Sequence, residues 1–177
     1  CRSVESTKKG RTVGEMALQR QTNQGWALAT ETRFRGELKG DCYLEGGAFL
    51  YTGETGSTRA FRSPWGRWPK WSELYLYSLV PEGGPANWAN VAGPFVESRL
   101  ELGESSHLRL GAIALYAPAP DWESRGVLLK AELRFRLMPE LSGHLLWEGL
   151  ETGPFHAEPD GASFHHFLRW QVNLELK

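Results

Sequence analysis

The sequence predicts an all-β protein, built as an antiparallel up-and-down β-barrel or as the C-terminal part of one, with about 7–8 long strands. Three observations predict this fold. Apolar and charged residues alternate with a period of two over runs of about 10 to 13 residues. Turn-forming residues separate the runs in a chain that holds 20 Gly and 10 Pro. Aromatic residues make up 12% of the chain, with eight Trp, as is typical of turn-rich β proteins with large amphipathic rings.

The chain divides into two parts by its pattern. Residues 1–24 are polar, carry several Lys and Arg, and lack a sustained period of two, so we expect an N-terminal tail or loop. Residues 25–177 carry the alternating runs and are predicted to form one β-barrel domain. Cys1 is either the lipid-carrying first residue of a processed lipoprotein or merely the residue at which this sequence starts. Cys1 and Cys42 lack the spacing of a disulfide scaffold, a zinc site or a c-type haem.

Eight runs are predicted as strands, each ended by turn residues such as Lys39-Gly40-Asp41 or Gly103-Glu104-Ser105-Ser106. Their length exceeds the usual ~5–6 residues of soluble strands and fits the ~9–11 residues of a tilted strand that spans a membrane. The predicted strands are residues 26–38, 42–52, 71–80, 91–102, 107–117, 127–137, 141–150 and 164–176.

The clearest alternation covers residues 127–137, and a second follows in residues 164–176. Strand parity assigns every side chain to one of two faces, because a slip of one residue would move all of them to the other face. The apolar face is predicted to include Leu129, Leu133, Phe135, Leu168, Val172 and Leu174. The polar face is predicted to include Arg99, Arg134, Arg136 and Arg169 with Glu97, Glu101 and Glu132, the charges of neighbouring strands interleaving.

Alternation alone does not say which face meets water. A small soluble barrel encloses its apolar face, whereas an outer-membrane barrel turns that face to lipid and lines its lumen with polar groups. The long runs favour the membrane version, as do Trp26, Trp71, Trp88, Trp147 and Trp170, which fall at or near predicted strand ends as girdle aromatics do. We therefore expect the apolar face to contact lipid.

Two stretches of the sequence resemble a known family. One is Arg67-Trp68-Pro69-Lys70-Trp71-Ser72-Glu73-Leu74-Tyr75-Leu76-Tyr77 followed by Trp88-Ala89-Asn90, and the other is the close through Gly143 to Glu148 and Phe167-Leu168-Arg169-Trp170. These stretches are similar to the late strands of alginate-export-type outer-membrane porins. The resemblance covers about residues 25–177. Family members have roughly twice as many strands, and their usual closing aromatic residue is absent here, since the chain ends Glu175-Leu176-Lys177. The resemblance implies passage of an acidic polysaccharide.

Other classes of function lack their residues. With 20 Lys+Arg against 21 Asp+Glu, the chain offers no basic surface for nucleic acid. Residues 111–120 are too short an apolar stretch for a membrane-spanning helix. The sequence has no nucleophile elbow, P-loop or dinucleotide fingerprint, so no enzyme is predicted. Adjacent His165 and His166 should point to opposite faces, which excludes joint metal binding.

Two further pairs of residues have spacings found in metal or catalytic sites, but we predict no such role for them. His144 and Glu148 have the spacing of a zinc helix but lie in a predicted strand, and Glu97 and Glu101 flank Arg99 in a charge ladder rather than forming an acid/base pair. No catalytic residue, metal or cofactor is predicted.

The sequence thus predicts a porin-like channel or scaffold of a bacterial outer membrane, passing anionic polysaccharide or small polar solutes and contacting membrane lipid. The alternatives are a soluble or lipid-anchored β-barrel that binds an apolar ligand, and a non-conducting structural subunit of a larger membrane assembly. The candidate pore-lining residues are Arg33, Arg35, Arg99, Arg109, Lys130, Arg134, Arg136 and Arg169.

Overall fold

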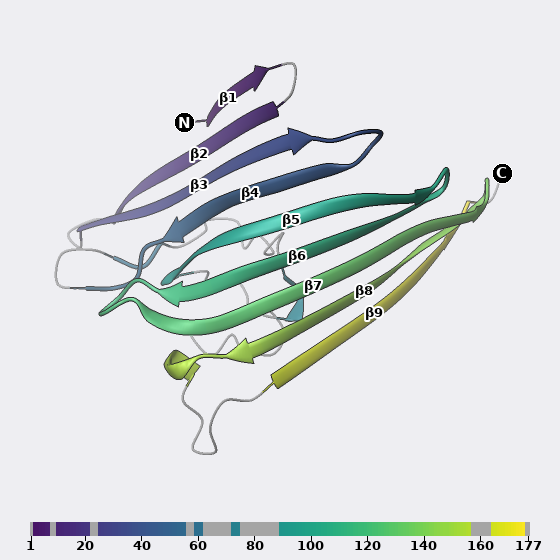
Figure 1. The fold of residues 1–177 in the computed structure, drawn as a ribbon. Helices are drawn as coiled ribbons and strands as arrows, with labels where there is room; N and C mark the ends of the chain where they lie inside the picture. Colours follow the sequence, from purple (N-terminus) through teal and green to yellow (C-terminus); the bar gives the residue numbers. More distant parts are fainter. Residues whose placement is uncertain are drawn as a thin grey trace.

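Nine antiparallel strands lie side by side in chain order in the computed structural model, as one twisted and curved sheet (Figure 1). The structure describes residues 2–7, 10–21, 25–55, 59–61, 72–74, 89–156 and 164–175. The strands are β1 (Arg2–Thr7), β2 (Gly10–Gln21), β3 (Gly25–Glu37), β4 (Tyr43–Tyr51), β5 (Val91–Gly103), β6 (Ser106–Ala117), β7 (Glu123–Met138), β8 (Leu141–Thr152) and β9 (Phe164–Leu174). A short 3₁₀ helix, η1 (Pro154–His156), follows β8.

The prediction of an all-β, up-and-down antiparallel fold is confirmed. Strands occupy more than half of residues 25–177, and the Lys39-Gly40-Asp41 turn is present with Gly40 at φ 70°. The predicted strand over residues 71–80 lies largely outside the described residues, and residues 72–74 within it are not a strand. None of the helical segments in the described parts of the chain has the length and apolar character of a membrane-spanning helix.

The structure corrects the prediction for residues 1–24. Residues 2–7 and 10–21, predicted as a polar tail or loop, form β1 and β2. Strand β2 pairs with β3 from Gly10↔Gly36 to Gln21↔Gly25. Backbone hydrogen bonds to a neighbouring strand need no alternating side-chain pattern, so pairing with β3 can hold a segment whose local signal is weak. Cys1 lies outside the described residues.

The described sheet is not closed into a barrel. Strand β1 pairs with β2, strand β9 pairs with β8, and no pairing joins β1 to β9 among the described residues. Because each neighbour is antiparallel in a nine-strand meander, β1 and β9 run in the same direction.

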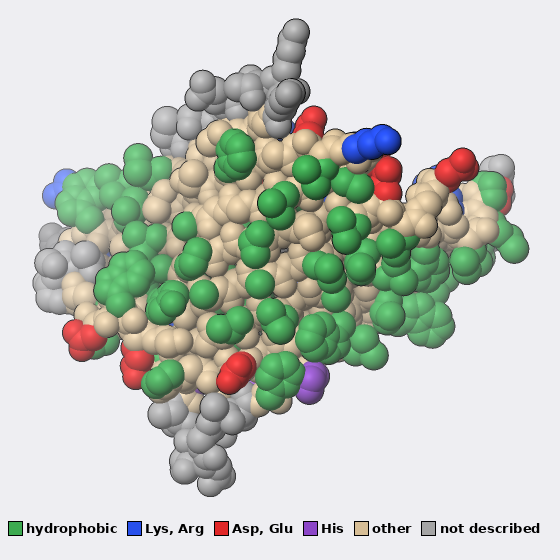
Figure 2. Space-filling view, viewed as in Figure 1, with side chains coloured by type: hydrophobic (Ala, Val, Ile, Leu, Met, Phe, Trp, Pro, Cys, Tyr) green, Lys and Arg blue, Asp and Glu red, His purple; other side chains and the backbone are tan. Residues whose placement is uncertain are grey.

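One face of the sheet, which we call the outer face, is uncovered and apolar. Figure 2 shows hydrophobic side chains across this face, with charged groups mainly at its margins. The predicted apolar residues lie here, and Leu129, Leu168, Val172 and Leu174 are exposed over 41% to 67% of their surface. Further exposed residues of the outer face are Met16, Leu18, Trp26, Phe34, Leu44, Val96, Leu100, Leu110, Tyr116, Val127, Leu145 and Trp170.

The opposite face, which we call the inner face, is partly covered by residues of the segment between β4 and β5. Its apolar half forms a core in which Leu74 of that segment packs among strand residues. The buried members are Phe49, Leu74, Val91, Ile113, Leu115, Leu128 and Leu150. The other half, toward the β3–β4, β5–β6 and β7–β8 turns, carries the charged side chains.

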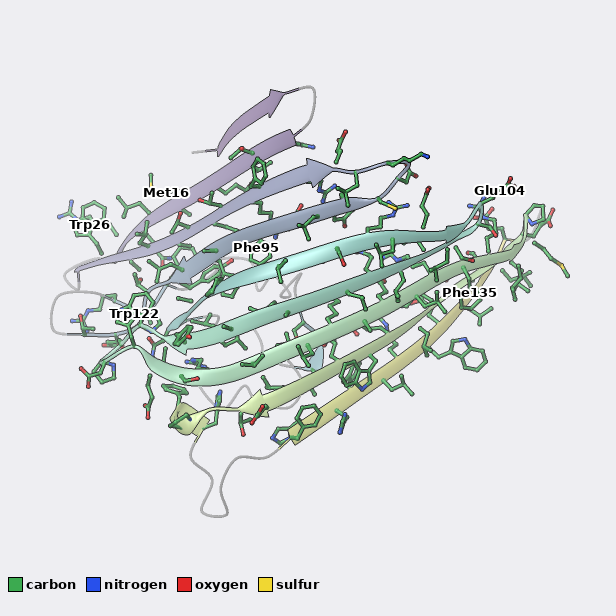
Figure 3. All side chains as sticks on the ribbon, viewed as in Figure 1. Met16, Trp26, Phe95, Glu104, Trp122 and Phe135 are labelled. Atoms are coloured by element: carbon green, nitrogen blue, oxygen red, sulfur yellow. The ribbon has the colours of Figure 1, made fainter. Side chains whose placement is uncertain are left out.

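Two exposed tryptophans, Trp26 and Trp122, mark one end of the outer face. Trp26 near the start of β3 and Trp122 before β7 lie at the same end of the sheet, opposite Glu104 and Phe135 (Figure 3). Of the other tryptophans predicted at strand ends, Trp147 and Trp170 lie in the middle of β8 and β9, and Trp71 and Trp88 are outside the described residues.

Candidate functional site

A band of ion pairs crosses the inner face from β3 to β7. Strand parity places acidic and basic side chains of neighbouring strands on this face at similar height, as the sequence predicts. We define the ion-pair band as Glu31, Arg33, Arg35, Glu45, Glu97, Arg109, Glu132 and Arg134.

The β3 end of the band is organised around the Glu45 carboxylate, which is only 4% exposed. Arg33 donates from Nη1 to Glu45 Oε1 at 3.3 Å, and Arg35 donates from Nε to Glu45 Oε2 at 2.8 Å. Arg33 also contacts Glu31 on its own strand. The Arg35 guanidinium stacks over the Tyr43 ring at 3.9 Å. A buried carboxylate is costly unless it is paired, and two arginines supply that pairing here.

The β7 end of the band is organised around Arg109 of β6. Its Nη2 lies 2.6 Å from Glu97 Oε1, and its Nη1 lies 3.2 Å from Glu132 Oε2. The Tyr43 hydroxyl donates to the same Glu97 oxygen at 2.7 Å, and Arg134 Nε donates to Glu132 Oε1 at 2.8 Å. Through Tyr43, the two ends of the band form one continuous network over five strands.

The expectation that opposite charges interleave holds for only some directly paired residues. Arg35↔Glu45, Arg109↔Glu132 and Lys130↔Glu148 pair opposite signs, but Glu45↔Glu97 and Arg99↔Arg109 place like charges opposite each other. Direct pairing of like charges is unfavourable. The diagonal contact from Arg109 to Glu97 and the two arginines that contact Glu45 offset this repulsion. The long side chains therefore form ion pairs with residues that are not directly opposite in the register.

All eight candidate pore-lining residues belong to the inner face by strand parity, but they have different surroundings. Four of them, Arg33, Arg35, Arg109 and Arg134, belong to the ion-pair band. Arg99 Nη2 lies 3.7 Å from the exposed Asp41. Lys130 and Arg169 lie beside residues 72–74, where Lys130 contacts Glu148 and Arg169 contacts Glu73. Arg136 lies further along β7, near the β7–β8 turn.

The histidines follow the strand parity that the sequence predicts. His165 pairs with Leu150 on the inner face, and His166 pairs with Gly149 on the outer face. His144 Nε2 contacts the Arg169 guanidinium, with a distance of 2.9 Å to Nη2. In the described part of the chain, no group of three or more His, Cys, Asp or Glu side chains is arranged to hold a metal ion.

Sequence reasoning missed two features of this site. Tyr43 joins the two ends of the band, and its hydroxyl reaches Glu97 because β4 and β5 are neighbours in the sheet. Ser72 and Glu73 contact the inner face from a segment that was predicted as a strand. No local sequence signal marks either contact.

Comparisons of this chain with protein-family models, with curated proteins and with solved structures found no match.

Proposed function

We propose that this chain forms part of the wall of a β-barrel in a bacterial outer membrane and acts there as a porin-like channel. The observation that carries the proposal is the contrast between the two faces. Large apolar side chains are exposed on β2 to β9 of the outer face, while the inner face carries the ion-pair band. Soluble monomers rarely expose apolar patches larger than a few hundred Å². Lipid is the surrounding that suits such an extended face.

The aromatic residues at one end of the outer face support this orientation. Trp26 and Trp122 are exposed by 51% and 57%, and Tyr116 and Phe164 lie at the matching ends of β6 and β9. Trp and Tyr favour the boundary between headgroups and acyl chains because their rings are amphipathic. This end of the sheet is therefore assigned to one membrane interface.

The open edges support a barrel with further strands. Unpaired backbone groups are not tolerated in the hydrocarbon region, so a lipid-exposed sheet must be closed. Because β1 and β9 run in the same direction, pairing them would be parallel. Closure with antiparallel neighbours throughout requires an odd number of additional strands. The resemblance to the late strands of alginate-export-type porins, which have roughly twice as many strands, supports the same proposal.

The charged inner face supports a polar or anionic solute. Arginines and glutamates facing a lumen suit anionic polysaccharide or small polar solutes, which exchange hydration for weak charged contacts. The uncovered outer face argues against a soluble or lipid-anchored module for an apolar ligand, because such a barrel would enclose its apolar side chains, and here they are exposed. A non-conducting structural subunit would share the wall and lack the lumen.

The test is ion selectivity of the reconstituted protein in a planar bilayer. Replacing Arg134 and Arg136 together by Glu should shift the preference away from anions, since both project from the inner face of β7. Replacing both by Lys keeps the charge and should leave the selectivity unchanged. If the Glu variant conducts with unaltered selectivity, these residues do not line the conducting path. If the folded wild-type protein carries no current, the structural subunit replaces the channel.

A further inference from the structure

Glu148 of β8 differs from the other buried carboxylates of the inner face in its hydrogen-bond donors. Its side chain is 0% exposed. One oxygen, Oε2, accepts three hydrogen bonds from residues 72–74: from Ser72 Oγ at 3.0 Å, from Glu73 N at 2.8 Å and from Leu74 N at 2.7 Å. Figure 1 shows these three residues as a short blue-green piece behind β7 and β8. A single strand carboxylate thus binds the backbone of a segment that is 74 to 76 residues away in the chain.

The surroundings of Glu148 stabilise its charge. Lys130 lies directly opposite on β7, with its ammonium group 3.5 Å from Glu148 Oε1. An ionised carboxylate without partners is among the most costly groups to bury. Lys130 and the three donors offset this cost together, and no donor other than Lys130 faces Oε1 in the described structure. The site is therefore built around the presence of residues 72–74.

Two further contacts hold the same three residues. Leu74 is 1% exposed and packs in the apolar core of the inner face with Leu128 and Leu150. Glu73 forms an ion pair with Arg169 of β9, which also contacts His144. Residues 72–74 are thus fixed by an apolar side chain, an ion pair and a carboxylate that accepts backbone hydrogen bonds.

The ion-pair band offers the contrast. Glu45 and Glu132 are also buried, at 4% exposed each, but their partners are arginines of the sheet itself, on the same strand or a neighbouring one. Those pairs stiffen the wall and need nothing from outside the sheet. Glu148 instead accepts hydrogen bonds from three residues outside the sheet, Ser72, Glu73 and Leu74.

We propose that Glu148 is a positioning residue that pins residues 72–74 across the inner face beside β7, β8 and β9, and so narrows the path that a solute can take. The inference rests on the proposed channel, since the inner face is a lumen only in a closed barrel. It removes Lys130 and Arg169 from the solute-contacting set, because Lys130 pairs with Glu148 itself and Arg169 pairs with Glu73. Arg109 and Arg134 then remain next to the open part of the path.

The first experiment measures amide hydrogen exchange of the peptide containing residues 72–74 in detergent-solubilised protein. Glu148→Leu removes the acceptor for all three donors and should raise the exchange rates of the Glu73 and Leu74 amides about tenfold or more. The reason is that each lost hydrogen bond to a charged acceptor raises the equilibrium constant for local opening by about tenfold. Glu148→Gln keeps a carbonyl oxygen and should give a smaller rise. The matched control is Glu151→Gln, an exposed carboxylate three residues along β8, on its outer face.

If the Leu variant does not fold, Ser72→Ala is used instead, because it removes one of the three donors without changing the sheet. The exchange rates of residues 73 and 74 are then measured in that variant. Unchanged exchange at residues 73 and 74 in a folded Glu148 variant would overturn the anchoring role.

The second experiment measures single-channel conductance of the same variants. Release of residues 72–74 should raise the conductance of Glu148→Leu above that of the wild type and of Glu151→Gln. Faster exchange with unaltered conductance would show that the segment does not narrow the path, which overturns the proposal for the lumen. Faster exchange in a protein that never conducts would mean that the channel function has failed while the anchor holds.

Discussion

Replacing Leu129 by Arg tests whether the outer face meets lipid. Leu129 is 41% exposed and lies near the middle of the 16-residue strand β7. The residues directly opposite are Ala112 and Gly149, so a longer side chain has room and the cost arises mainly from its charge. An Arg on the lipid face costs about 2–4 kcal/mol at the bilayer midplane. In water, a surface substitution of this kind changes stability by about 0.5 kcal/mol or less.

The matched control is Leu137→Arg on the same face of the same strand. Leu137 lies eight residues further along β7 and is 68% exposed. Eight residues span about 26 Å of strand, which at a tilt of about 40° corresponds to about 20 Å of depth. The control position then lies at or beyond the edge of the hydrocarbon core, where Arg costs about 0–1 kcal/mol.

The assay is equilibrium unfolding by denaturant in phospholipid vesicles, followed by tryptophan fluorescence. We expect a difference of about 2 kcal/mol or more between the two variants, which is more than a tenfold change in the folding equilibrium. Equal and small effects at both positions would place the outer face in water or against a partner, and the membrane assignment would be wrong.

Two further pairs of substitutions test the packing and the ion pairs of the inner face. Ala in place of Gly93 would bring its Cβ within 1.9 Å of a backbone oxygen of β6, whereas the Cβ of Gly111→Ala meets nothing closer than 3.6 Å. We expect Gly93→Ala to lose about 3 kcal/mol of folding stability or to fail to assemble. Gly111→Ala should retain wild-type heat resistance on a gel. Arg109→Met leaves the carboxylates of Glu97 and Glu132 without their shared cation and should lower the folding stability by about 2–4 kcal/mol in the same vesicle assay. The control is Arg99→Met, since the Arg99 side chain is equally exposed, at 31%. This variant loses only a pair with an exposed carboxylate, and its stability should fall by about 1 kcal/mol or less. Equal losses in either pair of variants would contradict these contacts.

Sequence patterns predicted the strands that carry their own alternation. Strand β7 was predicted as residues 127–137 and runs from Glu123 to Met138, and β9 was predicted as 164–176 and runs from Phe164 to Leu174. The eight candidate pore-lining residues were assigned to one face by parity alone, and the registers place them there. A strand fixes side-chain direction locally, so this part of the candidate site needed no knowledge of the neighbours.

The sequence pattern failed to predict strands that are held by pairing with a neighbouring strand. Strands β1 and β2 lack a period of two, and pairing with β3 is what makes β2 extended. The pattern also missed the apolar half of the inner face. Leu115 and Leu128 share the face of the arginines and are fully buried, because Leu74 comes from a distant segment to cover them.

By itself, the sequence determined two faces of opposite character, because side-chain direction along a strand is a local property of the backbone. Only the tertiary structure decided which face is covered, which charges meet and which carboxylate serves another segment. Glu148 shows the difference: parity assigns it to the inner face with the other acids, but its burial and its three donors depend on residues 72–74. Contacts between residues so far apart in the chain are set by the packing of the whole sheet, which has no signature in any short stretch of sequence.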